Sequence, residues 1–161
     1  MKILNIKAAG LGGQGVLKVT DIIADAAFIT GKDIKKSEVH GMSQRGGSVA
    51  SDVRIAMEGT SSVASPMIPA GEVDVLIVLD LSQKELYKEF LRDGCVVITP
   101  EDLVTPPENP KALNIALLGA AAPAIGFDDE TWHKAICMEL PEALQEMNIR
   151  IFDRARSESR F

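Results

Sequence analysis

The sequence predicts an α/β protein: a Rossmann-like, three-layer domain with a mainly parallel sheet and helices on both of its faces. Two observations lead to this class. Short apolar runs of strand length alternate along the 161 residues with segments of helical periodicity. A glycine-rich turn at residues 10–15 follows the first apolar run and precedes the first helical pattern. We expect residues 1–161 to form a single domain, because no linker or repeat interrupts them.

Apolar runs and alternating patterns predict the strands. They are residues 3–9, 33–39, 48–57, 73–79 and 95–99. The run over residues 73–79 is almost continuously apolar, which is typical of a central parallel strand that is buried on both faces. Residues 48–57 alternate between apolar and polar positions, which predicts a less buried strand.

Helical spacing and capping signals predict the helices. The first, over residues 14–30, has an apolar stripe formed by Val16, Val19, Ile23, Ala26 and Ala27. The others are predicted from Ser82 to residue 91, over residues 111–125, from Asp128 or Asp129 onward, and from Pro141 onward. In the helix at 111–125, Gly119 and the alanines after it predict a close approach to a neighbouring element.

Composition and charge argue against several classes of partner. The formal net charge is -6, and an acidic surface repels phosphate backbones, so we expect no nucleic-acid partner. No apolar run reaches the ~20 residues that span a bilayer, so we expect no membrane partner. The chain begins with a strand pattern rather than a signal peptide, and Cys95 and Cys137 lie far apart. We therefore expect reduced thiols in a cytoplasmic protein.

The first motif that could bind a ligand is Gly-Leu-Gly-Gly-Gln-Gly at residues 10–15. Its spacing is G-x-G-x-x-G, between a predicted strand and a predicted helix. Glycines let the backbone turn tightly, and a helix N-terminus offers free N–H groups to an anion. The candidate cofactor-binding residues are Gly10, Gly12, Gly13, Gln14 and Gly15. The alternative is a tight turn with close helix packing and no ligand.

A nicotinamide cofactor is one ligand that this turn could accept. Such a cofactor normally needs an acid at the end of the second strand to bind its ribose, and Glu38 lies at about the right distance. However, Lys35 and Lys36 share that strand, and no helix is predicted between it and the next strand. The dinucleotide hypothesis is therefore the weaker one.

The second motif covers residues 37–48 and concentrates polar groups and glycines. His40 can exchange a proton near neutral pH, and Arg45 can hold a carboxylate or phosphate by two hydrogen bonds. These two residues are the catalytic candidates, although the sequence assigns neither a firm role. The alternative is a well-bonded loop in which Gly46 and Gly47 supply unusual backbone angles.

Three other sequence features bear on function less directly: a proline-containing segment, Asp80 and the absence of several known motifs. The segment 65–69 contains Pro66 and Pro69 around apolar residues, which suits either a docking surface or a plain surface loop. Asp80 ends the central strand where α/β folds place their sites. The chain lacks a P-loop, a cysteine cluster for iron–sulfur and any metal-ligand set, so we expect no metal site and no tightly bound cofactor.

Three segments together resemble the gamma-type domain of the 2-oxoacid:ferredoxin oxidoreductases. They are Gly-Leu-Gly-Gly-Gln-Gly at 10–15, Ser-Glu-Val-His-Gly-Met at 37–42 and Gln-Arg-Gly-Gly-Ser-Val at 44–49. The His-Gly pair at 40–41 is similar to the indolepyruvate-type members, since pyruvate-type members tend to carry Tyr-Gly there. The similarity extends over nearly the whole chain.

The resemblance implies an accessory subunit of an enzyme that oxidatively decarboxylates an arylpyruvate to an acyl-CoA and passes electrons to ferredoxin. It implies that thiamine diphosphate, magnesium and [4Fe–4S] clusters belong to a large partner subunit, with coenzyme A as a substrate. The glycine turn and the loop of His40, Gln44, Arg45, Gly46 and Gly47 would then face that partner. A homodimer is also compatible with the sequence. The alternatives are a free-standing dinucleotide-binding oxidoreductase and a non-catalytic assembly module.

Overall fold

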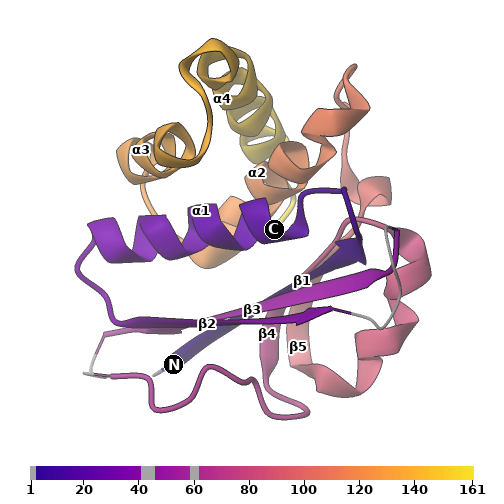
Figure 1. The fold of residues 1–161 in the computed structure, drawn as a ribbon, viewed down its shortest axis with the longest axis vertical. Coiled ribbons are helices and arrows are strands. Elements are labelled where there is room, and N and C mark those ends of the chain that lie inside the picture. Colours follow the sequence, from indigo (N-terminus) through magenta and orange to yellow (C-terminus); the bar gives the residue numbers. More distant parts are fainter. Residues whose placement is uncertain (1–2, 41–45, 59–61) are drawn as a thin grey trace.

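The computed structural model describes residues 3–40, 46–58 and 62–161 (Figure 1). The strands are β1 (Ile3–Leu11), β2 (Ile34–His40), β3 (Ser48–Ala56), β4 (Val73–Val78) and β5 (Leu91–Ile98). The α-helices are α1 (Val16–Ile29), α2 (Leu113–Ile125), α3 (Asp129–Glu139) and α4 (Glu142–Ser157). The 3-10 helices are η1 (Leu81–Gln83), η2 (Glu85–Phe90), η3 (Pro100–Asp102) and η4 (Pro110–Ala112). The α/β class is confirmed.

The strands form a mixed sheet in the order β2-β3-β1-β4-β5. Strands β1, β4 and β5 are parallel, whereas β3 is antiparallel to both β1 and β2. The expectation of a mainly parallel sheet is therefore confirmed only in part: β1, β2, β4 and β5 run in the same direction, but β3 runs against both of its neighbours. Only residues 41–47 connect β2 to β3, which is too short for the crossover that parallel neighbours need. The two strands consequently pair as a hairpin, and β3 inserts between β2 and β1.

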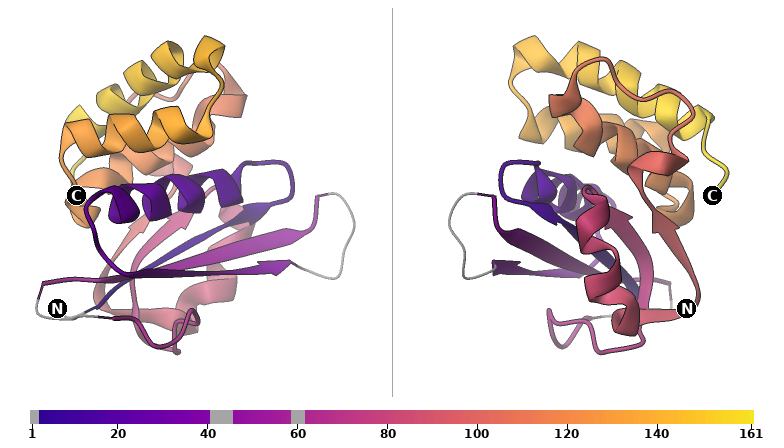
Figure 2. Two further views of the ribbon diagram at one scale, coloured as in Figure 1. Left: turned by 60° about the vertical axis from the view of Figure 1, so that its left-hand side comes forward. Right: turned by 90° about the vertical axis from the view of Figure 1, so that its right-hand side faces the viewer.

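All four α-helices lie on one face of the sheet (Figures 1 and 2). Helices α1 and α2 cover the strands, and α3 and α4 pack over them as an outer layer. The other face carries the 3-10 helices η1 and η2 and the segment 62–71. The expectation of helices on both faces therefore needs correction. The connection from β4 to β5 contains only 3-10 turns, so no long helix forms on that side.

The main core lies between the sheet and the helices. All five apolar positions of the predicted stripe on α1 are buried there: Val16, Val19, Ile23, Ala26 and Ala27. Helix α2 is buried along most of its length because the sheet lies on one side and α4 on the other. A Cβ on Gly119 would overlap the backbone oxygen of Phe152 and lie 3.0 Å from the Cβ of Ala155. The predicted close approach is thus made to α4.

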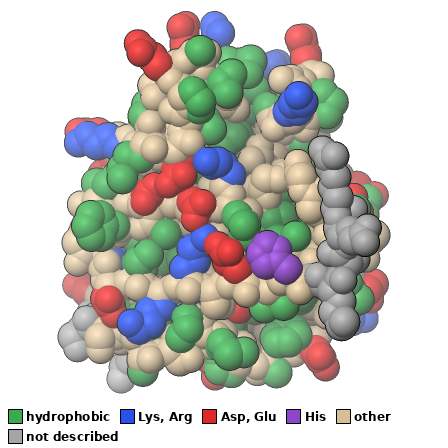
Figure 3. Space-filling view, in the orientation of Figure 1, with side chains coloured by type: hydrophobic (Ala, Val, Ile, Leu, Met, Phe, Trp, Pro, Cys, Tyr) green, Lys and Arg blue, Asp and Glu red, His purple; other side chains and the backbone are tan. Residues whose placement is uncertain are grey.

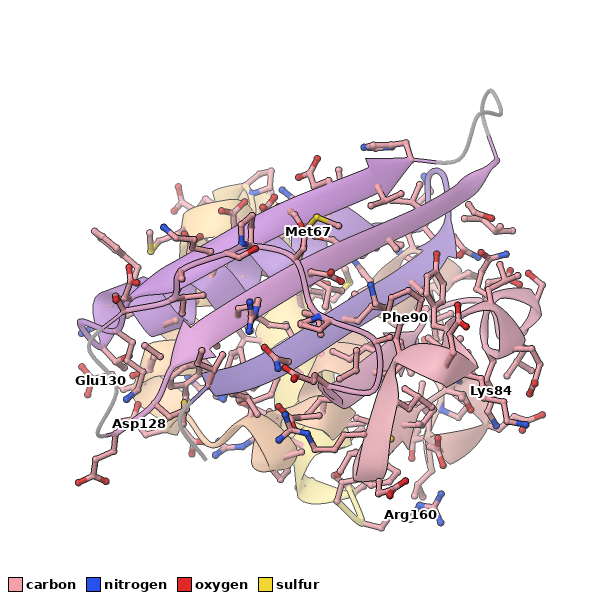
Figure 4. The ribbon with its side chains drawn as sticks, turned by 90° about the horizontal axis from the view of Figure 1, so that it is seen from below. Met67, Lys84, Phe90, Asp128, Glu130 and Arg160 are labelled. Carbon is pink, nitrogen blue, oxygen red and sulfur yellow. The ribbon has the colours of Figure 1, made fainter. Side chains whose placement is uncertain are left out.

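The apolar core on the second face of the sheet is smaller than the main core, and it borders a buried ion pair. Lys7 Nζ donates to Asp52 Oδ1 at 2.6 Å, beneath the rings of Tyr87 and Phe90 at 5.2 and 5.0 Å. Lys7 and Asp52 are only 5% and 8% exposed. This buried ion pair lies under η2, where Figure 4 labels Phe90.

The proline-containing segment 65–69 lies across this face (Figure 4). Arg54 Nη1 donates to the backbone oxygens of Ser65 and Met67 at 2.9 and 3.0 Å and holds the segment on the sheet. Ile68 points inward and is 4% exposed, whereas Met67 is 68% exposed. The segment therefore presents Met67 outward, and a docking role for it stays a prediction.

The ends of several elements differ from the prediction. Where one helix was predicted from Ser82 to residue 91, the chain forms two 3-10 helices, η1 and η2, and the N-cap of η1 is Asp80, whose side chain accepts the Ser82 N–H. Strand β5 begins at Leu91 rather than at Cys95. Asp128 is the N-cap of α3, and Pro141 directly precedes α4. The starts of η1 and α3 depend on Asp80 and Asp128, whose side chains each accept a free N–H, and periodicity does not encode such a cap.

Asp25 gives the fold a predicted pH dependence. Its Oδ2 is buried without a hydrogen-bond donor among the described residues. Burial and the nearby carboxyl of Glu139 raise the pKa of Asp25 to about 7. Because the folded state holds this proton more tightly than the unfolded state, the free energy of unfolding falls as pH rises from about 4 to about 7.

We expect Asp25→Asn to remove this loss. At pH 8 the variant should melt at least about 3 °C above the wild type, and at pH 4 the two should melt together. Thermal unfolding followed by circular dichroism at both pH values measures the difference. An equal shift at both pH values would contradict the assignment to Asp25.

Candidate functional site

The glycine-rich turn joins β1 to α1, as the sequence predicts. Strand β1 continues through Leu11, and α1 begins after Gly15. Gly13 and Gly15 have φ values of 89° and 83°, in the left-handed region that favours glycine. Both are therefore required by the backbone path, whether or not a ligand binds.

The N-terminus of α1 is open. Val19 N–H donates to Gly15 O, the first bond of the helix, and no side chain caps this end. Within residues 3–40, 46–58 and 62–161, the N–H groups of Val16, Leu17 and Lys18 have no acceptor. Free N–H groups and the positive end of the helix dipole together favour an anion at this position.

The two glycine motifs meet at this end of the sheet. Gly12 N–H donates to Gly47 O at 2.8 Å, and Leu11 pairs with Ser48 across β1 and β3. A Cβ on Gly12 would lie 3.1 Å from Gly46 N, so a side chain there would fit only if the neighbouring motif shifted slightly. Gln44 and Arg45 lie outside the described residues. Their partner-facing role, and the catalytic candidacy of Arg45, stay predictions.

An open pocket of about 440 Å³ lies beside the turn. Its walls are the glycine turn, the first turn of α1, the end of β2 and Val49. His40 and Lys18 both line it. Figure 3 shows the charged side chains that gather on this face, over α1 and along the edge strand β2. The pocket is therefore bordered by helix N–H groups and by side chains that can carry positive charge.

Lys18 is a candidate that the sequence interpretation missed. Its Nζ donates to Glu139 O at 3.1 Å and lies 3.5 Å from Glu139 Oε2. A lysine in the first turn of a helix is unfavourable toward the helix dipole. That placement is the signal in the sequence that could have identified it, since an anion at the helix N-terminus would offset the repulsion.

His40 lies at the end of a row of ionisable side chains on β2 and α1. Its Nε2 lies 3.7 Å from Glu38 Oε2, and Lys36 Nζ donates to Glu38 Oε1 at 2.9 Å and to Asp21 Oδ1 at 2.6 Å. Lys36, and then His40, lower the pKa of Glu38. The acid that a nicotinamide ribose would need is therefore already paired with the Lys36 ammonium.

The side chain of Gln14 makes its hydrogen bonds to the turn and to Asp80, and its predicted role in binding a ligand stays a prediction. Its Oε1 accepts the Leu11 N–H at 2.7 Å, and its Nε2 donates to Asp80 Oδ2 at 3.1 Å. Hydrogen bonds from Ser82, and a further one from Gln14, lower the pKa of Asp80. Asp80 thus lies at the site, as its place at the end of the central strand suggested.

Asn114, at the start of α2, is the second residue that the sequence interpretation missed. Its Nδ2 donates to Gly15 O at 3.4 Å, and its Oδ1 accepts the Ile115 N–H. A Cβ on Gly15 would overlap the Asn114 amide. A polar residue directly before a long apolar run was the available signal, but its partner is 99 residues away.

The described part of the chain contains neither a metal-binding cluster nor a membrane-spanning helix. No group of three or more His, Cys, Asp or Glu side chains there could hold a metal ion. No helix in the same residues is long and apolar enough to cross a membrane.

The sequence pattern of the pyruvate ferredoxin/flavodoxin oxidoreductase family matches residues 5–110. The chain belongs to this family. The resemblance to the gamma-type domain of the 2-oxoacid:ferredoxin oxidoreductases is therefore confirmed. The match includes the glycine turn, the segment around His40 and Arg45, and the central strand β4.

The chain is similar in sequence to individual 2-oxoacid oxidoreductase subunits. The chain is 42% identical over 104 residues to the indolepyruvate oxidoreductase subunit IorB of Archaeoglobus fulgidus, which covers 65% of this chain and 49% of the relative. It is 27% identical to the subunit of that name from Methanothermobacter thermautotrophicus, over 92% of this chain and 93% of the relative. The alignment thus spans about half of the Archaeoglobus relative.

Solved structures share the fold. The gamma subunit of a keto/oxoacid ferredoxin oxidoreductase from Geobacter sulfurreducens aligns with a TM-score of 0.76 and 27% identity, over 97% of this chain and 98% of that chain. The 2-oxoglutarate:ferredoxin oxidoreductase from Magnetococcus marinus, solved with 2-oxoglutarate, coenzyme A and succinyl-CoA bound, aligns with a TM-score of 0.79. It is 18% identical, over 99% of this chain and 31% of that chain, and shows the fold alone.

Proposed function

We propose that this chain is the accessory, gamma-type subunit of a 2-oxoacid:ferredoxin oxidoreductase whose substrate is indolepyruvate or a similar arylpyruvate. The reaction is oxidative decarboxylation to an acyl-CoA, with two electrons passed to ferredoxin. The names of the Archaeoglobus and Methanothermobacter relatives support the substrate. One observation carries the role: the hydrogen bond from Gly12 N–H to Gly47 O joins both family motifs beside the open pocket.

The pocket suits an anionic group that meets the partner's active site. The free N–H groups at the start of α1 can bind phosphate oxygens, and Lys18 and His40 can approach the same group. Coenzyme A is a substrate of the proposed reaction and carries phosphates. We therefore propose that the glycine turn faces the large subunit and contacts coenzyme A there. Arg45, in the same motif, is proposed as a further contact.

The redox chemistry is assigned to the large subunit. A [4Fe–4S] cluster needs four cysteine ligands, and this chain has two cysteines in all. We propose that thiamine diphosphate, magnesium and the clusters are held by the partner, and that ferredoxin binds the complex. A homodimer of this chain and a cytoplasmic location stay predictions.

Reconstitution with the large subunit tests this proposal. The isolated chain is expected to show no decarboxylation of indolepyruvate. The large subunit alone should reduce ferredoxin slowly, and adding this chain should raise the rate at least tenfold and saturate at a fixed ratio of subunits. A large subunit that works at full rate without this chain would overturn the proposal. Heat released on titration of the chain with NAD(H) or NADP(H) would support the dinucleotide alternative instead.

A further inference from the structure

The side chain of Gln14 ties the glycine-rich turn to the end of β4. Its Oε1 accepts the Leu11 N–H at 2.7 Å, and its Nε2 donates to Asp80 Oδ2 at 3.1 Å. One amide orientation satisfies both bonds, because the backbone N–H needs an acceptor and the carboxylate needs a donor. We propose that Gln14 and Asp80 form a positioning pair that holds the turn with its N–H groups toward the pocket.

Asp80 is itself held in place on its other side. Its Oδ1 accepts the Ser82 N–H at 3.1 Å and the Ser82 hydroxyl at 2.6 Å. The carboxylate therefore cannot rotate toward the pocket without breaking three hydrogen bonds. The turn is thus connected through two side chains to η1, rather than resting on its own backbone bonds alone.

The first glycine of the motif fits this arrangement. A Cβ on Gly10 would lie 2.8 Å from Gln14 Oε1 and 3.0 Å from the Cβ of Leu79. The space that a side chain would fill is occupied by the Gln14 amide. Gly10 therefore leaves room for the Gln14 amide, and its predicted place beside a ligand stays a prediction.

The consequence for function rests on the proposed role of the turn in contacting coenzyme A. Gln14 lies inside the turn, so it acts through the backbone and not on the reacting atoms. Releasing it should loosen the N–H groups that bind the anion and leave the chemistry of the partner's active site intact. The expected signature is a higher KM for coenzyme A with little change in kcat.

A double-mutant cycle tests the pair in the reconstituted complex. Gln14→Glu places two carboxylates opposite each other, and we expect the KM for coenzyme A to rise about tenfold while kcat stays within about twofold. Asp80→Asn is expected to act in the same direction. In the double variant the introduced carboxylate can accept both the Leu11 N–H and the introduced amide, so the KM should return to within about threefold of wild type.

Hydrogen exchange of the Leu11 amide gives a second readout on the full chain alone. Exchange should be slow in the wild type, faster in Gln14→Glu and slow again in the double variant. If the wild-type chain does not activate a large subunit, the proposed function fails, yet this exchange pattern still decides the pair. Unchanged exchange in Gln14→Glu, or no recovery in the double variant, would overturn the positioning role.

Gln145→Glu is the matched control. Among the described residues, Gln145 in α4 makes no hydrogen bond to the turn: its Nε2 donates to the backbone oxygens of Cys137 and Leu140 at 3.2 and 3.0 Å. The same substitution there removes two hydrogen bonds and should lower Tm. It should leave both the KM for coenzyme A and the Leu11 exchange unchanged, and an effect on either would mean that general destabilisation explains the results.

Discussion

Gly15→Ala is expected to reduce the activity that this chain confers on the complex at least tenfold. Gly15 has φ of 83°, where an L side chain costs roughly 1–2 kcal/mol. In addition, the new Cβ would overlap the Asn114 amide at the start of α2. Either the Asn114 amide rotates away and gives up its hydrogen bond to Gly15 O, or the turn moves away from α2; both changes disturb the support of the open N–H groups at the start of α1. Ferredoxin reduction by the reconstituted complex measures the loss.

Gly31→Ala is the control for the conformational cost of placing an L residue at a positive φ. Gly31 follows the other end of α1 with φ of 75°, and a Cβ there would meet nothing within 4 Å. We expect it to lower the free energy of unfolding by about 1 kcal/mol and to leave the activity of the complex unchanged. Equal effects of the two substitutions on activity would show that the position of Gly15 beside Asn114 has no special role.

Asp52→Ala is expected to lower the free energy of unfolding by about 3–5 kcal/mol, because it leaves the buried ammonium of Lys7 without its counter-ion. Lys7 is 5% exposed and lies 2.6 Å from Asp52, under Tyr87 and Phe90. Urea unfolding at pH 7 measures this loss. The aromatic rings contribute too little to a charge without a partner to offset its desolvation.

Two comparisons separate the buried pair from ordinary ion pairs. The double variant Lys7→Met, Asp52→Ala removes both charges and should recover most of the lost stability. Glu130→Gln breaks the exposed pair with Lys134, which has an N–O distance of 2.9 Å, and should cost at most about 0.5 kcal/mol. A double variant no more stable than Asp52→Ala would show that the loss comes from packing rather than from the charge on Lys7.

The sequence alone determined the features that depend on neighbouring residues. The apolar stripe of α1, the buried run of β4 and the turn from Gly10 to Gly15 are local, since 3.6-residue periodicity, apolar runs and glycine spacing are visible within one segment. The two glycine motifs also identified the family, because their joint occurrence needs no knowledge of how they lie in space.

The tertiary structure alone decided the features that depend on which segments meet. Strand β3 inserts between β2 and β1 and makes the sheet mixed, although its own pattern is compatible with either direction. Asp80 lies 66 residues from Gln14, and Asn114 lies 99 residues from Gly15. No pattern within one segment encodes such contacts, because they arise only when the packing of the sheet and helices brings the ends of β1, β4 and α2 together. The glycine turn is therefore predictable as a shape, whereas the side chains that hold it became known only from the folded chain.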